Sequence, residues 1–240
     1  MKKYIKKIIQ KIKVRNCINN YNKLIPGSEK WLIATEYIYG GFVSNVKRNK
    51  TSPFDHRSLH EISTGGMTGG DRMLHHGYAT YYARYILNRK KHVQSIAEIG
   101  ILKGSGLAMW CDLFPKSRVI GLDIDLNHTK NNIDNLIKLG AFKTKLPELY
   151  EFDQLVENRQ YLNTFFQDGS LDICIDDGLH SNKAILCTLN SILPYLASEF
   201  IYFVEDNFEV HLEIKKTYPG FNVENFGALT VITPDLYSLK

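Results

Sequence analysis

From residue 93 to residue 232 the sequence alternates short apolar segments with longer amphipathic ones, and this alternation restricts the fold more than any other feature. Short segments rich in isoleucine, valine and phenylalanine predict strands, and the longer segments between them predict helices. The predicted strands are 93–99, 118–124, 148–152, 171–176, 200–204 and 228–232. The predicted helices between them are about 105–113, 126–139, 154–166 and 182–196. Strands that alternate with helices form parallel sheets with right-handed crossovers.

We therefore predict an α/β fold, a Rossmann-like, doubly wound and mostly parallel sheet with an antiparallel C-terminal edge and an N-terminal helical extension. The 240 residues are enough for one such domain. The expected organisation is a basic amphipathic helix or tail at 1–24, a helical and loop cap region at 25–92, and the sheet domain at 93–240.

The net charge of +5 is concentrated at the N-terminus, where residues 1–24 hold eight Lys or Arg and no acid. The remainder has 22 basic and 25 acidic residues, which argues against a general nucleic-acid groove. Ile5, Ile8, Ile9 and Ile12 follow helical spacing, so this segment is a candidate for peripheral contact with an anionic membrane. The alternatives are a helix docked on its own domain or on a partner subunit, such as a second copy in a homo-oligomer, and a solvated end.

The expected location is the cytoplasm, with residues 1–24 as the candidate contact to the inner face of the membrane. No run approaches the roughly 18 apolar residues of a membrane span, and the N-terminus lacks the apolar core of a secretory signal. The four cysteines are far apart, which is typical of buried thiols in a reducing compartment.

Residues 46–72 are rich in polar residues and glycine and are predicted to be irregular, a type of segment that often forms a functional lid. A helix is expected to follow, through Tyr78, Tyr82 and Ile86. His75 and His76, between the two, are candidates to line the substrate side.

The first strand of the sheet domain ends at Glu98 and Gly100 and leads through Gly104 and Ser105 into a helix. Glycines at such a turn let the backbone approach a ligand. The spacing G-x-x-x-G-x-G differs from the G-x-G-x-x-G of dinucleotide binders. The Glu98 carboxylate would repel a pyrophosphate but attract the ammonium group of S-adenosylmethionine. The alternative is a tight strand–helix turn without a ligand.

Asp123 ends the second strand, where an acid can accept hydrogen bonds from both ribose hydroxyls. Asp153 and Gln154 follow the third strand, where an adenine amino group could be recognised, although this pair could equally cap a helix. Asp176, at the end of the fourth strand, is a further candidate cofactor contact.

Two neighbouring strands end in pairs of acids, Asp176-Asp177 and Glu205-Asp206. Such a cluster would repel itself without a cation, and Mg²⁺ or a similar ion with oxygen ligands would resolve the repulsion. A metal can lower the pKa of a substrate hydroxyl, and His180 could then take the proton as general base. The alternatives are an Asp that only caps a helix and a His that is merely exposed.

Several segments together resemble the metal-dependent sugar O-methyltransferases of the macrocin and mycinamicin type. They are GGDRMLHHGY (69–78), AEIGILKGSGLAMWCDLFPKSRVIGLDID (97–125), EFDQ (151–154), LDICIDDGLH (171–180) and YFVED (202–206). The resemblance implies an S-adenosylmethionine-binding methyltransferase domain at 93–240 that acts on a sugar hydroxyl. The site residues that it implies are metal ligands Asp177, Glu205 and Asp206, base His180, and cofactor contacts Glu98, Gly100, Asp123, Asp153 and Gln154.

The sequence departs from this family at three places. Gly104-Ser105-Gly106 stands where the family has glycine-glycine-serine, Leu179 replaces a usual serine, and residues 196–199 lack the usual double glycine. The first 45 residues and those after Asp206 have no counterpart, so the acceptor is open: a nucleotide sugar, a surface-glycan intermediate or a natural-product sugar. A nicotinamide-dependent oxidoreductase and a non-catalytic binding protein with the same fold are the competing interpretations.

Overall fold

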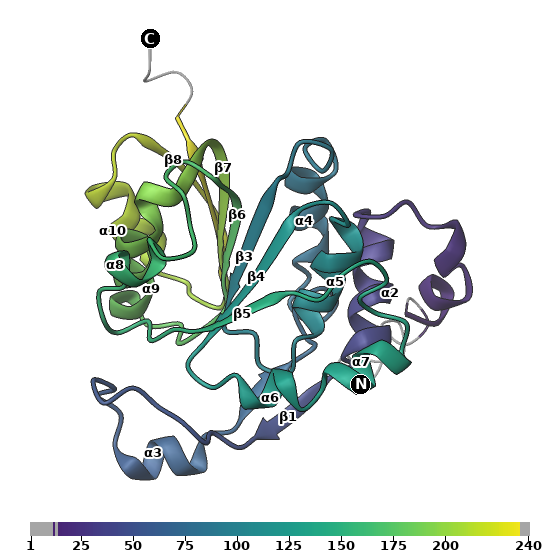
Figure 1. Cartoon of the computed structure of the whole chain (residues 1–240), viewed down its shortest axis with the longest axis horizontal. Helices are drawn as coiled ribbons and strands as arrows, with labels where there is room; N and C mark the ends of the chain where they lie inside the picture. Colours follow the sequence, from purple (N-terminus) through teal and green to yellow (C-terminus); the bar gives the residue numbers. More distant parts are fainter. Residues whose placement is uncertain (1–11, 13, 236–240) are drawn as a thin grey trace.

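The computed structural model describes residue 12 and residues 14–235 (Figure 1). Its centre is a seven-stranded sheet of order β5-β4-β3-β6-β7-β9-β8. The strands are β3 (Ser95–Ile99), β4 (Arg118–Asp123), β5 (Glu148–Glu151), β6 (Leu171–Asp176), β7 (Leu196–Val204), β8 (Phe221–Phe226) and β9 (Leu229–Pro234). Strands β5, β4, β3, β6 and β7 are parallel, whereas β9 is antiparallel to both of its neighbours. The predicted fold class is confirmed.

Helices cover both faces of the sheet (Figure 1). They are α2 (Glu29–Tyr39), α4 (Ala79–Ile86), α5 (Ser105–Leu113), α6 (Asn127–Lys130), α7 (Ile133–Lys138), α8 (Arg159–Leu162), α9 (Asn182–Ile192) and α10 (Val210–Thr217), with 3-10 turns η1 (Tyr21–Lys23) and η2 (Leu193–Tyr195). α8, α9 and α10 lie on one face and α2, α4 and α5 on the other. The side chains of Ser28 and Ser181 cap the N-termini of α2 and α9.

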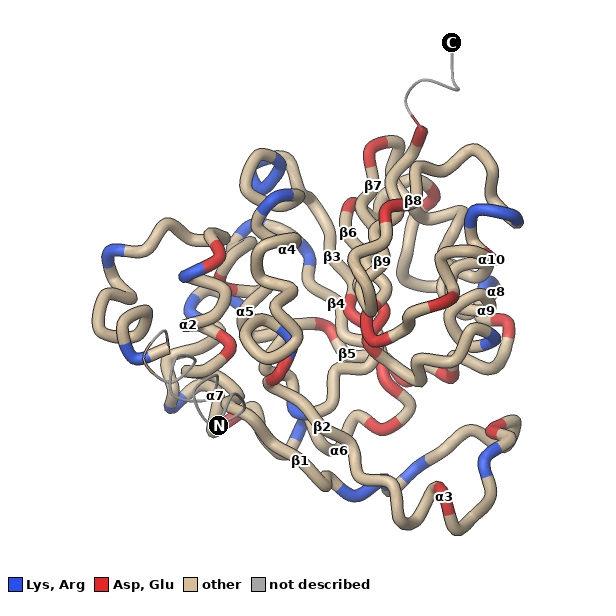
Figure 2. The backbone as a smooth tube through the Cα atoms, turned by 180° about the vertical axis from the view of Figure 1, so that it is seen from behind, with Lys and Arg blue, Asp and Glu red and all other residues tan. Residues whose placement is uncertain are grey.

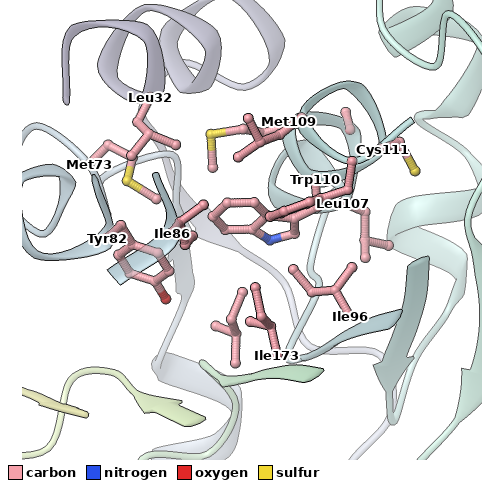
Figure 3. Close-up of a cluster of buried hydrophobic side chains, with 14 of the residues drawn as sticks. Leu32, Met73, Tyr82, Ile86, Ile96, Leu107, Met109, Trp110, Cys111 and Ile173 are labelled. Atoms are coloured by element: carbon pink, nitrogen blue, oxygen red, sulfur yellow. The ribbon is translucent and has the colours of Figure 1, made fainter. Parts of the chain in front are cut away.

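The central strands β3, β4, β6 and β7 are largely buried on both faces and supply alternate residues to two hydrophobic clusters. Ile173 and Phe203 face α4 and α5, whereas Cys174 and Tyr202 face α9 and α10. Figure 3 shows the first cluster around the fully buried indole of Trp110. This packing fixes the strands, and therefore the positions at which they end.

Residues 42–70 form an arm, called the strap here, at the carboxyl ends of the parallel strands (Figure 1). Strands β1 (Val43–Val46) and β2 (Met67–Gly69) pair antiparallel, and α3 (Leu59–Thr64) lies between them in sequence. Ser58 and Glu61 form a capping box at the start of α3. Hardly any of the strap is buried, so it contributes little to the core.

The structure differs from the predicted elements in several regions. Residues 46–72, predicted to be irregular, contain α3 and β2, and the helix predicted at 182–196 ends at Ile192. The helix predicted at 154–166 is reduced to α8, because the Asn158 side chain donates to the carbonyls of Asp153 and Val156 and so stabilises a turn. The helix predicted at 126–139 is divided into α6 and α7. Strand β8 was not predicted, and it takes the edge position outside β9.

Most of the predicted N-terminal amphipathic helix lies outside the described residues. Residues 14–19 are helical, and Val14 and Cys17 in this segment are buried, so this part docks on its own domain. None of the described helices combines the length and the apolarity that crossing a bilayer requires.

Candidate active site

Strands β3, β6 and β7 are neighbours in the sheet, and they bring their terminal acids to one edge. Pairing continues one residue beyond the strands, because the Asp177 N–H donates to the Ile99 carbonyl and the Glu205 N–H to the Asp176 carbonyl, both at 2.9 Å. The carboxylates of Glu98, Asp177 and Glu205 consequently share one cation, the guanidinium of Arg72. The predicted convergence of acids is therefore observed.

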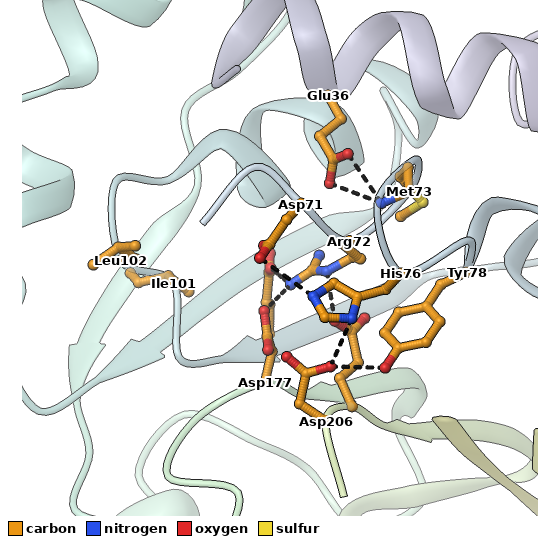
Figure 4. Close-up of polar contacts among 12 residues, drawn as sticks. Glu36, Asp71, Arg72, Met73, His76, Tyr78, Ile101, Leu102, Asp177 and Asp206 are labelled. Carbon is orange, nitrogen blue, oxygen red and sulfur yellow. Dashed lines mark hydrogen bonds and ion pairs between the residues drawn. The ribbon is translucent and has the colours of Figure 1, made fainter. Parts of the chain in front are cut away.

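Arg72 lies between these carboxylates (Figure 4). Its Nη2 donates to Glu98 Oε1 at 2.6 Å and to Asp177 Oδ2 at 2.7 Å, and its Nε donates to Glu205 Oε2 at 2.8 Å. The Tyr82 hydroxyl donates to the other oxygen of Glu205. Only 7% of Arg72 and 1% of Glu205 is exposed. The protein itself thus supplies a cation for the cluster, whereas the sequence reasoning assigned that role to a metal.

Glu36 on α2 fixes the turn that carries Arg72. Both of its carboxylate oxygens accept from the Met73 N–H, at 2.9 and 3.1 Å. Burial raises the pKa of Glu36 to about 7, although Arg72 and the Met73 N–H act in the opposite direction. Glu36 therefore positions Arg72 through the backbone.

Burial dominates the electrostatics of the acidic cluster. It raises the pKa of Asp177 and of Glu205, and the positive charge of Arg72 partly offsets this effect. Burial alone would lower the pKa of Arg72, but the three carboxylates raise it well above its usual value. Arg72 therefore stays charged, and its removal would leave buried acids without a counter-charge.

Asp177, His180 and Asp206 form a candidate cation site, because one ligand atom of each lies within 4.8 Å of the others. Nδ1 of His180 is buried without a hydrogen-bond partner among the described residues. His180 and Asp206 both have left-handed backbone conformations, with φ of 58° and 54°. Residues other than glycine are held in such conformations mostly where function requires it. Two carboxylates and an imidazole suit a divalent cation.

Glu205 is not part of this cation group. Both of its oxygens already accept hydrogen bonds, from Arg72 and from Tyr82, so metal binding by Glu205 remains a prediction that requires sharing these oxygens. His180, predicted as a base, lies within reach of the same cation.

Asp206 has a second set of neighbours on the side away from Asp177 (Figure 4). The Tyr78 hydroxyl donates to Asp206 Oδ1 at 2.7 Å, and His76 Nδ1 lies 3.6 Å from the same oxygen. His76 Nε2 lies 3.2 Å from Asp71 Oδ2, and this contact raises the pKa of His76. His76 lines the cavity, as the sequence suggested, whereas His75 is exposed and does not line it.

The cofactor half of the site is built on the turn after β3. Gly100 has φ of 80°, and a Cβ placed on it would lie 2.1 Å from the Asp177 carbonyl oxygen. Position 100 therefore requires glycine because the main chain that follows β6 packs directly against it, whether or not a ligand is bound. Asp123 Oδ2 accepts from the N–H groups of Ile101 and Leu102 at 2.9 and 3.1 Å, so this acid also shapes the turn.

Gln154 connects the strand ends on the other side of the cavity. Its Nε2 donates to Asp176 Oδ1 at 2.7 Å and to Thr188 Oγ1 at 3.0 Å, and its Oε1 accepts from the Leu179 N–H at 2.7 Å. Burial raises the pKa of Asp176 to about 6. Asp153 Oδ1 accepts from the Leu155 N–H within a turn, and the next helix, α8, begins only at Arg159, so Asp153 does not cap a helix.

A cavity of about 710 Å³ joins these elements and extends beneath the strap. Eight predicted residues line it on both sides: Glu98, Gly100, Ser105, Asp123, Asp153, Gln154, Asp177 and His180. Glu205 and Asp206 also line it, whereas Gly104 and Asp176 lie behind the wall. The strap is tied across the opening by exposed contacts, Lys50 to Glu151 at 2.5 Å and His56 to Lys183 at 3.0 Å.

Sequence reasoning missed Arg72, Glu36 and Tyr82. One signal could have found Arg72: it is the single Lys or Arg between Arg57 and Arg84, it lies within a segment of the family resemblance, and the acidic strand ends lacked a protein cation. No comparable signal distinguishes Glu36 or Tyr82 from ordinary helix residues.

Comparison with known proteins shows that the chain is similar in sequence to methyltransferases. It is 25% identical over 170 residues to mycinamicin VI 2''-O-methyltransferase of Micromonospora griseorubida, a match that covers 68% of this chain and 38% of that protein. It is 26% identical over 188 residues to L-olivosyl-oleandolide 3-O-methyltransferase of Streptomyces antibioticus, covering 75% and 42%. The chain thus spans less than half the length of these relatives. No protein-family model matches it.

Solved structures support the fold. The methyltransferase MycE of the mycinamycin biosynthetic pathway, solved with Mg and SAH, aligns with a TM-score of 0.51 at 16% identity over 65% of this chain and 49% of that one. The same enzyme has been solved with Mg, SAH and mycinamycin VI, with the same TM-score. The chain therefore has the methyltransferase fold, and its sequence is similar to that of sugar O-methyltransferases.

Proposed function

We propose that this protein is an S-adenosylmethionine-dependent O-methyltransferase that acts on a sugar hydroxyl with the help of Mg²⁺ or a similar divalent cation. The observation that carries the proposal is the joint placement of Asp177, His180 and Asp206 beside a cavity that also reaches the turn at 100–106. Similarity to sugar O-methyltransferases supports the reaction type.

The residues present suit both groups that the reaction requires. Asp177 and Asp206 offer oxygen ligands to a divalent cation, and the partnerless Nδ1 of His180 faces no competing protein donor among the described residues. Asp123 and the turn after Gly100 offer polar contacts to a ribose and a methionine chain. Glu98 was expected to attract the cofactor ammonium, but one of its oxygens already binds Arg72.

When bound, S-adenosylmethionine would supply a methyl group on a positively charged sulfur, and a divalent cation would lower the pKa of the acceptor hydroxyl. Asp177 and Asp206 would hold the cation. His180 would take the hydroxyl proton. The hydrogen bond from Arg72 fixes the Asp177 carboxylate, so this proposed metal ligand is in position before the acceptor binds.

The two competing functions have weaker support. A nicotinamide-dependent oxidoreductase would bind a pyrophosphate at the glycine turn, where the Glu98 and Asp123 carboxylates line the cavity. A non-catalytic binding protein would not need His180 and Asp206 in left-handed conformations beside the cavity. Titration calorimetry with S-adenosylmethionine and with NADH distinguishes the methyltransferase from the oxidoreductase. A measurement of methyl-transfer turnover distinguishes the methyltransferase from the non-catalytic binding protein.

The decisive test is incubation with methyl-labelled S-adenosylmethionine and a panel of sugar acceptors, with products identified by mass spectrometry. We expect a labelled methyl group on a sugar oxygen. Chelation should abolish transfer and Mg²⁺ should restore it, and Asp177→Asn should prevent that restoration. Transfer that survives chelation would refute the metal while leaving the methyltransferase in place.

We further propose a small-molecule or glycan-linked sugar as the acceptor, and residues 1–24 as a peripheral contact with an anionic membrane or with a second copy. The basic charge of this segment supports the former. Deletion of residues 1–24 that leaves partition to anionic vesicles unchanged would refute membrane contact. Unchanged oligomeric mass after the same deletion would refute contact with a second copy of the chain through this segment.

A further inference from the structure

Among the residues beyond position 24, the strap and the remainder carry opposite net charges. Residues 42–70 contain four Lys or Arg and two acids, whereas the other residues beyond position 24 contain 18 basic and 23 acidic residues. Figure 2 shows blue segments along the strap and red segments gathered at the strand ends that face it. The cavity therefore has one basic wall and one acidic wall.

Two arginines of the strap, Arg48 and Arg57, line the cavity with few partners for their charge. Arg57 donates from its Nε to both Asp55 oxygens, at 3.0 and 3.1 Å. Arg48 donates to the Gly65 carbonyl, and none of the described carboxylates forms an ion pair with it. Asp55 therefore pairs with Arg57, Glu61 adds a second negative charge near Arg57, and the guanidinium of Arg48 is without an ion pair among the described residues.

The two arginines are close enough to repel each other. Burial lowers the pKa of Arg48, and the charge of Arg57 lowers it further, with Asp55 as the only offset. A bound anion would offset this repulsion between the two cations. The hydroxyl groups of Thr51 and Ser52 line the same wall and add neutral hydrogen-bonding groups.

We propose that Arg48 and Arg57 bind a phosphate group of the acceptor, so that the acceptor is a phosphate or diphosphate ester of a sugar. The neutral sugar ring lies toward His180 and Asp206, and the phosphate lies under the strap. This inference rests on the proposed function and narrows its substrate class.

The chemistry of the two walls favours this orientation. The fork of an arginine matches the geometry of a phosphate and can donate two hydrogen bonds to it. The acidic wall repels a phosphate but accepts hydroxyl groups and a cation, so the charged and neutral parts of one molecule are sorted by the two walls. The strap contacts at Lys50 and His56 hold the basic wall over the cavity.

Calorimetry with inorganic pyrophosphate tests the anion site without turnover. We expect the wild type to bind pyrophosphate, and Arg48→Gln and Arg57→Gln to bind it about 10-fold to 100-fold more weakly. Asp55→Asn keeps the turn but removes a competing charge, so it should bind severalfold more tightly. Lys47→Gln is the matched control, because Lys47 is an exposed strap cation that does not line the cavity.

Three results would overturn the anion site: no binding by the wild type, an equal loss in Lys47→Gln, and pyrophosphate binding that is abolished by S-adenosylhomocysteine. The last would mean that the anion occupies the donor site.

Methyl transfer to three acceptors then identifies the source of the phosphate. A nucleoside diphosphate sugar, a polyprenyl diphosphate sugar and the uncharged methyl glycoside of the same sugar are compared by kcat/KM. We expect one charged acceptor to exceed the glycoside at least 10-fold, and Arg48→Gln to erase that advantage, whereas the control Lys47→Gln retains it. Equal kcat/KM for all three overturns this inference but not the proposed function. No transfer to any acceptor, with no binding of S-adenosylmethionine, overturns the proposed function and with it the role of the anion.

Discussion

The strand-end cluster and the strap both line the same cavity, but they are held in opposite ways. In the cluster, Arg72 is 7% exposed and bonds three carboxylates from three strand ends. In the strap, Arg57 bonds one acid two residues away, and the contacts with the body are exposed polar pairs. The first region is fixed by burial, so its charges are costly to disturb. The second is fixed by weak surface contacts, so its charges remain available for a ligand.

The largest effect expected from this difference is on stability. Arg72→Met leaves Glu98, Asp177 and Glu205 buried without their cation and should lower the free energy of unfolding by about 3–5 kcal/mol. Arg57→Gln, the matched change in the strap, should lower it by less than about 1 kcal/mol. Urea unfolding measures both. Equal losses would remove the distinction between the two regions.

The next effect concerns catalysis. His180→Ala should lower kcat by about two to four orders of magnitude, because a general base is lost, while the unfolding midpoint stays near that of the wild type. His60→Ala, an exposed histidine on α3 of the strap, should change neither quantity. Methyl-transfer kinetics with S-adenosylmethionine give the answer. A His180→Ala enzyme with normal turnover would assign the proton transfer to another group.

A third prediction follows from Glu36, whose pKa is raised to about 7 in the folded protein from an ordinary value of 4.5. The folded state holds this proton more tightly, so its contribution to stability is complete below about pH 4.5 and is lost as the pH rises to about 7. Glu36→Gln keeps an oxygen for the Met73 N–H and should remove up to ~3 kcal/mol of this pH dependence. Denaturant unfolding of both proteins at several pH values between 4 and 8 measures the difference. Parallel curves would show that Glu36 titrates normally.

The smallest effect should come from the Lys50–Glu151 pair, in which both side chains are about half exposed. Lys50→Gln should change the unfolding free energy by less than about 1 kcal/mol, and added salt should reduce that change further. Unfolding at low and high salt, with hydrogen exchange of the strap amides, checks this. A loss above about 2 kcal/mol would mean that the strap belongs to the cooperative core.

Prediction from the sequence was most accurate for strands whose bounds follow from a local residue pattern. Strand β6 was predicted at its observed bounds, because an apolar run ends abruptly in two acids. Strand β8, with the polar sequence FNVENF, has no such contrast and was missed. The predicted strand at 228–232 was correctly expected to be antiparallel, but it lies inside β8 rather than at the edge.

In the candidate site too, the residues that could be predicted are those marked by a local pattern. Asp177, His180 and Asp206 could be found because each follows a strand end, and the ends of adjacent parallel strands meet. Arg72 could not be placed, since its partners lie 26, 105 and 133 residues away and only the tertiary fold brings them together. The strap contacts likewise join residues about 100 or more positions apart, as between Lys50 and Glu151.

The close approach of Gly100 to the carbonyl of Asp177 has a consequence for changes to this protein. A single layer of main chain separates the donor pocket from the cation pocket, and it contains no room for even a methyl group. Any side chain introduced at position 100 would displace the main chain of Asp177, one of the proposed metal ligands. If the proposed function holds, a substitution there would alter donor binding and metal affinity together, whereas substitutions in the strap would leave this contact intact.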